Sequence, residues 1–156
     1  MARKNRPEKY IKQRFSYLVI LVCIRLIRAV PRRVGMAVMR AGAGVFYRMP
    51  TVARKRTIRH LTLAFGKEKS REEIWRIGRD VFRHFAMAGV DAIRIPQMIE
   101  KGMDQFITSE NLHVLDRALA EKKGVIVLTG HFGNWELMGA YMAQKGYPIK
   151  AIGAPL

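Results

Sequence analysis

Hydrophobic and polar positions in the middle of the chain alternate with the period of a helix. Five apolar residues recur at spacings of three and four: Ile74, Ile77, Val81, Phe85 and Ala88. This stripe predicts an amphipathic helix. Ser70 and Glu73 precede it at the spacing of a capping box, and the helix is expected to end before Pro96. Three shorter elements are also expected: a helix capped by Thr51, a strand over residues 106–108 and a helix from Leu112 to Gly124.

A different pattern begins at Gly124. Residues 125–128 (V-I-V-L) are apolar without interruption and rich in β-branched side chains, which is typical of a strand buried on both faces. Asn134 is a good helix N-cap, and residues 137–144 then read as a helix. A further strand is expected over residues 149–152, which implies a parallel pair with a right-handed crossover. The sequence therefore predicts an α/β fold, a mixed sheet with helices on both faces.

The first part of the chain combines apolar and basic residues. Residues 15–30 are largely apolar, interrupted by Ser16, Arg25 and Arg28. As a helix they would reach about 24 Å, which is short of a hydrocarbon core of roughly 30 Å. No small-residue cleavage site follows, which argues against a removable signal peptide. We therefore expect a helix that is embedded in, or partly crosses, the inner leaflet of a membrane.

The distribution of charge supports a membrane rather than a nucleic acid as the partner. The net charge is +17; residues 1–60 hold 16 Lys and Arg against one acid (+15), and residues 61–156 hold 13 against 11 (+2). Basic segments bind nucleic acid or anionic lipid. Here the basic residues alternate with Leu, Ile and Val rather than with stacking aromatics. Met49-Pro50 then divides a membrane-associating segment (residues 1–48) from a globular part (residues 49–156).

The residues that follow the expected strand carry the candidate chemistry. His131 would lie at the strand's carboxyl end, and Glu136 in the first turn of the next helix. Across the loop the two side chains can meet, and a carboxylate bonded to one imidazole nitrogen leaves the other free as a general base. Backbone N–H groups of Gly133 and Asn134 are candidates to stabilise an oxyanion. The same residues also fit a polar strand cap and a glutamate that only complements the helix dipole, so the pattern alone leaves both interpretations open.

A resemblance favours the catalytic interpretation. Residues 124–136 (GVIVLTGHFGNWE) resemble the H-x4-D/E box of the lysophospholipid acyltransferase superfamily and, more narrowly, the lipid A biosynthesis (lauroyl and myristoyl) acyltransferases, whose box reads H-F-G-N-W-E. Residues 59–65 resemble that family's R-N-L-x-x-A-F segment, with His60 in place of Asn. Residues 109–112 resemble its G-x-E-x-L segment, with a departure at the first position. The family's proteins are considerably longer, so the chain is expected to correspond to their amino-terminal half.

The resemblance implies a membrane-bound O-acyltransferase of lipopolysaccharide biosynthesis with a glycerol-3-phosphate acyltransferase-like sheet. It would transfer a fatty acyl chain from acyl carrier protein to a hydroxyl of a lipid A precursor, on the cytoplasmic face of the bacterial inner membrane. His131 would take the proton from the attacking hydroxyl, and Glu136 would hold the imidazolium that forms. Gly133 and Asn134 would contact the substrate or the oxyanion.

No metal or organic cofactor is expected for transfer from a thioester, and the chain's histidines show no ligand pairs at metal spacing. Two alternatives remain at this point: an acyltransferase for another lipid acceptor, such as a lysophospholipid or another glycolipid, and a non-catalytic membrane-anchored fragment. A nucleic-acid-binding module is a remote third, supported by the charge alone.

Overall fold

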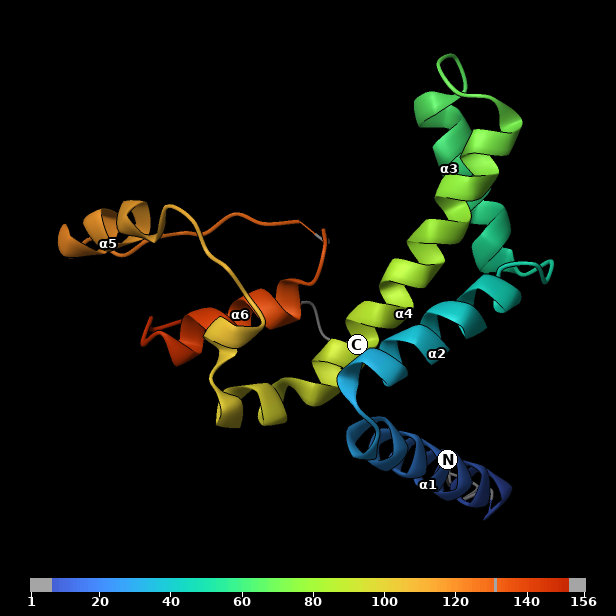
Figure 1. Ribbon diagram of the computed structural model, residues 1–156, viewed down its shortest axis with the longest axis horizontal. Coiled ribbons are helices and arrows are strands. Elements are labelled where there is room, and N and C mark those ends of the chain that lie inside the picture. Colours follow the sequence, from blue (N-terminus) through green and yellow to red (C-terminus); the bar gives the residue numbers. More distant parts are fainter. Residues whose placement is uncertain (1–6, 131, 152–156) are drawn as a thin grey trace, which may run out of the picture. The chain divides into compact units, whose positions relative to one another are not determined.

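The computed structural model describes residues 7–130 and 132–151, with side chains from Gln13 onward, and every regular element in this range is helical (Figure 1). The chain divides into two compact units, Met1–Ile93 and Arg94–Leu156, and α4 contributes residues to both. In chain order the elements are α1 (Pro7–Ala29), α2 (Arg32–Phe46), α3 (Val52–Phe65), α4 (Arg71–Lys101), the 3-10 turn η1 (Met103–Gln105), α5 (Leu112–Ala120) and α6 (Trp135–Gln144).

The predicted α/β fold is wrong, because the described residues contain no strand and therefore no mixed sheet. Residues 124–130 form an irregular connection between α5 and α6, and residues 106–108 and 149–151 are not strands either; Ile152 lies outside the described residues (Figure 1). A strand buried on both faces needs neighbours that pair its backbone and cover its side chains. Here the Ile126 and Leu128 side chains are 96% and 95% exposed. The apolar run thus lacks the neighbours that the prediction assumed.

The predicted capping box at the start of α4 is confirmed. The Ser70 backbone N–H donates to Glu73 Oε2 at 2.8 Å, and the Glu73 N–H donates to Ser70 Oγ at 3.2 Å. The hydrogen bond from the Ser70 backbone, followed by one from the Ser70 side chain, favours the charged carboxylate and lowers the pKa of Glu73. The predicted end of this helix was wrong, because α4 continues past Pro96 to Lys101. Burial of Met98, which is 2% exposed, helps to offset the hydrogen bond that the proline removes.

Two further helix starts agree with their expected caps. Thr51 Oγ1 accepts a hydrogen bond from the Arg54 N–H at 3.2 Å, and Asn134 Oδ1 accepts one from the Leu137 N–H at 3.1 Å. Each bond satisfies a donor that the first turn of a helix leaves unpaired. α5, in contrast, ends at Ala120 rather than at Gly124, so that end was misplaced.

α2 packs antiparallel along α4 in the first unit. The side chains nearest to three glycines show which residues face each other: Gly35 faces Val90, Gly44 faces Arg83, and Gly78 faces Tyr47. Residue numbers rise along α2 as they fall along α4, so the two helices are antiparallel. The Tyr47 ring is fully buried and makes edge contacts with Trp75 and Phe82 at centroid distances of 5.2 and 5.0 Å. Glycine at position 78 permits this close approach, because a Cβ there would overlap the Tyr47 hydroxyl. Burial raises the pKa of Tyr47.

An ion pair joins the start of α2 to α4. Arg32 Nε and Nη2 donate to Asp91 Oδ1 and Oδ2 at 2.7 and 2.9 Å, a two-pronged contact in which Asp91 is only 6% exposed. The hydrogen bond to Asp91 raises the pKa of Arg32. Arg28 Nε adds a bond from α1 to the Ile93 carbonyl at 3.0 Å. Side-chain hydrogen bonds thereby connect both α1 and α2 to α4.

None of the described helices is both long and apolar enough to cross a bilayer.

Candidate active site

The second unit holds the helix that carries the candidate box, and its core explains how that helix is fixed. Three buried residues, Met98, Met103 and Tyr141, form the centre of this core. They come from the end of α4, from η1 and from α6. Partly buried apolar side chains surround them: Phe106, Ile107, Leu112, Leu137 and Ala140. Burial of this cluster packs α6 against the segment that follows α4.

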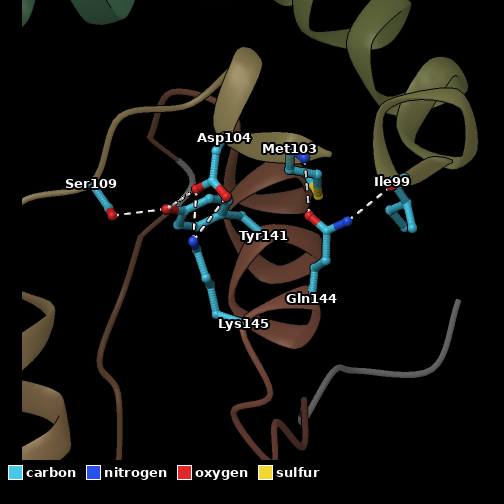
Figure 2. Close-up of polar contacts among 7 residues, drawn as sticks. All are labelled: Ile99, Met103, Asp104, Ser109, Tyr141, Gln144 and Lys145. Atoms are coloured by element: carbon cyan, nitrogen blue, oxygen red, sulfur yellow. Dashed lines mark hydrogen bonds and ion pairs between the residues drawn. The ribbon is translucent and has the colours of Figure 1, made fainter. Parts of the chain in front are cut away.

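A chain of hydrogen bonds centred on Tyr141 holds α6 in place (Figure 2). The Tyr141 hydroxyl lies 3.1 Å from Asp104 Oδ1 and 2.9 Å from Ser109 Oγ. A carboxylate only accepts, so the tyrosine donates its one proton to Asp104, and Ser109 must donate to the tyrosine. The phenol, which belongs to a residue only 5% exposed, therefore has both a donor and an acceptor.

Two residues at the end of α6, Gln144 and the C-cap Lys145, make further contacts (Figure 2). Gln144 Oε1 accepts from the Met103 N–H at 3.0 Å, and its Nε2 donates to the Ile99 carbonyl at 2.9 Å. Lys145 Nζ lies 2.7 and 2.9 Å from the two oxygens of Asp104. The hydrogen bond from Lys145, followed by that from Tyr141, lowers the pKa of Asp104, and the same pairing raises the pKa of Lys145. Polar bonds thus anchor α6 from its middle to its end.

The residues of the candidate box lie at the opposite end of α6. Gly133 adopts a φ of +60°, a left-handed turn that glycine accepts without strain, and Asn134 then caps the helix. Glu136 stands in the first turn and is exposed, where the helix dipole favours a carboxylate. The side-chain oxygen of Asn134 is engaged by the Leu137 N–H. His131 lies outside the described residues, so its contact with Glu136 stays a prediction.

A family model described as bacterial lipid A biosynthesis acyltransferase matches residues 3–155. The chain belongs to this family. Membership confirms the resemblance noted in the sequence and gives the chain an acyltransferase activity of the lipid A type, with a lipid A or glycolipid acceptor. A search of curated proteins and a search of solved structures each found no match.

The residues that anchor α6 were not predicted from the sequence. Tyr141, Gln144 and Lys145 share one face of the helix at spacings of three and four, which was a readable signal. Their partners Asp104 and Ser109 lie 37 and 32 residues before Tyr141, and no local pattern links such positions. Among the described residues, no group of three or more His, Cys, Asp and Glu side chains is arranged to hold a metal ion.

Proposed function

We propose that the chain transfers a fatty acyl group from acyl carrier protein to a hydroxyl of a lipid A precursor, in lipopolysaccharide biosynthesis, with its H-x4-E box as the catalytic site. The observation that carries the proposal is the start of α6 inside this box. Asn134 caps the helix, so Glu136 is exposed in the first turn, and the turn at Gly133 separates it from His131. A loop of this kind lets side chains five residues apart approach each other.

The proposed reaction uses these residues in a fixed order. His131 takes the proton from the acceptor hydroxyl as the oxygen attacks the thioester carbonyl, and Glu136 stabilises the imidazolium. The backbone N–H groups of Gly133 and Asn134 hydrogen-bond the oxyanion, helped by the positive end of the α6 dipole. The intermediate then collapses, the C–S bond breaks, and the carrier thiol leaves with the proton from His131. The ester product and the free thiol balance the reaction without a cofactor.

The amino-terminal segment supports a membrane site for this reaction. We propose that residues 1–48 associate with the cytoplasmic face of the bacterial inner membrane and that residues 49–156 carry the catalytic part. α1 exposes a set of large apolar side chains: Phe15, Tyr17, Leu18, Val19, Ile20, Val22 and Leu26. Basic residues lie in the same segment, and both anionic lipid headgroups and the phosphates of lipid A precursors complement them.

The test is acyl transfer by the purified chain in detergent, with acyl carrier protein thioesters and a lipid A precursor, followed by mass spectrometry of the product. His131→Ala should lower turnover by about 10²–10⁴-fold. Glu136→Gln should lower it nearly as much, and the double variant should lose little more because the two groups act as a unit. His113→Ala and Glu121→Gln are matched controls on exposed residues of the second unit. Undiminished turnover by Glu136→Gln would rule out the dyad, and a lysophospholipid product would reassign the acceptor.

A further inference from the structure

α2 has an exposed apolar face that its packing on α4 leaves uncovered. Val34, Val38, Ala41 and Val45 recur at spacings of four, three and four, which places them on one side of the helix. The three valines are 47%, 62% and 63% exposed, and Ala41 is exposed as well. We refer to these four residues as the valine stripe. α2 meets α4 through Gly35, Gly44 and Phe46, none of which belongs to the stripe, and the stripe residues stay exposed, so the stripe lies off the face of α2 that packs on α4.

Positive charge accompanies the valine stripe. Arg33 and Arg40 are exposed and lie two turns apart, so they follow one flank of the helix, and the exposed Arg48 lies just past the end of α2. The sequence has no acidic residue between Glu8 and Glu68. A surface with an apolar centre and basic flank complements an anionic lipid headgroup layer above an acyl region. The stripe spans twelve residues, and the eleven steps from Val34 to Val45 cover about 16 Å of helix, which suits a helix lying in the plane of a bilayer rather than crossing it.

We propose that α2 lies in the plane of an anionic bilayer, with the valine stripe at the acyl boundary and Arg33 and Arg40 at the headgroup phosphates. The inference rests on the proposed membrane association and deepens it, because it adds a second lipid contact to that of α1. It also orients the first unit. In this orientation the face of α2 that packs on α4 is turned away from the lipid.

The experiment attaches an environment-sensitive NBD dye to single cysteines in the full chain. One sample carries the dye on the native Cys23 of α1, which is exposed. Two others, in a Cys23→Ser background, carry it at Val45→Cys in the valine stripe or at Val114→Cys in α5, where the native valine is 53% exposed. Each sample is mixed with phosphatidylcholine vesicles with and without phosphatidylglycerol. We expect a blue shift of the dye at positions 23 and 45 on the anionic vesicles, and none at position 114.

Charge variants test the basic flank. Arg33→Gln/Arg40→Gln should weaken partition into anionic vesicles by about fivefold for each arginine. Arg71→Gln/Arg117→Gln removes the same charge from exposed positions outside α2 and should leave partition nearly unchanged. Circular dichroism confirms that each variant keeps its helices.

Three results would overturn the proposal. A shift at position 23 without one at position 45 would leave the membrane association in place but remove α2 from the lipid. No shift at either position would contradict both proposals. A shift at position 45 without vesicles would show that protein covers the valine stripe, and dependence of that shift on protein concentration would identify a second copy as the occupant.

Discussion

The close approach of Tyr47 to Gly78 predicts that alanine at position 78 destabilises the protein. Alanine in a helix interior is ordinarily about 1 kcal/mol more favourable than glycine. At position 78 the new methyl group would overlap the Tyr47 hydroxyl. That ring is fully buried between Trp75 and Phe82, so the hydroxyl has little room to move away. Steric overpacking of this kind costs about 1–3 kcal/mol. The net loss for Gly78→Ala is therefore between about 0 and 2 kcal/mol.

A second glycine of the same helix provides the control. Gly89 is exposed, and a Cβ there would meet no atom within 4 Å. Gly89→Ala should therefore stabilise the chain by the full propensity gain of about 1 kcal/mol. Tyr47→Phe should partly rescue Gly78→Ala, because it removes the overlapping oxygen while the ring carbon Cζ remains 3.0 Å from the added methyl position. The hydroxyl has no hydrogen-bond partner among the described residues, so its removal should cost little by itself.

Urea unfolding of the full chain in detergent, followed by far-ultraviolet circular dichroism, gives the comparison. Gly78→Ala should unfold at lower urea than Gly89→Ala, and the separation of the two variants reports the steric cost directly. If both variants are equally stabilised, Tyr47 does not contact Gly78, and the packing of α2 on α4 described above is wrong at this point.

Three further predictions concern ion pairs and the membrane. Asp91→Asn should destabilise the chain by about 2 kcal/mol. This is less than the loss expected from breaking a fully buried ion pair, because Arg32 is one-third exposed. A variant as stable as the parent in urea would contradict this prediction. Asp104 and Lys145 form an ion pair that lowers the pKa of Asp104 and raises the pKa of Lys145. The pair should stabilise the chain fully between about pH 4 and 10.4. Its contribution should disappear as pH falls through the lowered pKa of Asp104 or rises through the raised pKa of Lys145. The urea midpoints of the parent and Asp104→Asn should therefore converge in acid. High salt should not release the chain from membranes, whereas detergent should; release by a salt wash would show that residues 15–30 are not embedded.

The features predicted correctly from the sequence are those that a few neighbouring residues determine. Ser70 with Glu73, Thr51 and Asn134 each satisfy the first N–H groups of their own helix, so their spacing suffices to place three helix starts. Helix ends were less predictable. Pro96 would end an isolated helix, but the packing of Met98 in the second unit favours its continuation.

The features predicted wrongly depend on distant parts of the chain. An apolar run such as residues 125–128 has the same pattern whether or not neighbouring strands cover it. Only the rest of the fold determines whether the run becomes a strand. The apolar stripe of α4 is similarly incomplete evidence: Phe85 belongs to it but is 73% exposed, whereas Gly78, which no hydrophobic pattern marks, is buried against Tyr47. In the candidate site, the position of Glu136 follows from the local cap. The Tyr141 network that anchors the same helix could not be predicted, because its partners are remote in sequence.

The exposed connection that precedes the box should exchange its backbone amide hydrogens with solvent quickly. Residues 124–130 belong to no helix and all are exposed, so deuterium should enter their amides without any prior unfolding event. The amides in the middle of α6, by contrast, exchange only when the helix opens. A ligand that orders or covers the connection would slow uptake at residues 125–128 while leaving uptake in α6 nearly constant. Deuterium uptake by the exposed run therefore reports whether a ligand is bound next to the box, and it does so without a measurement of turnover.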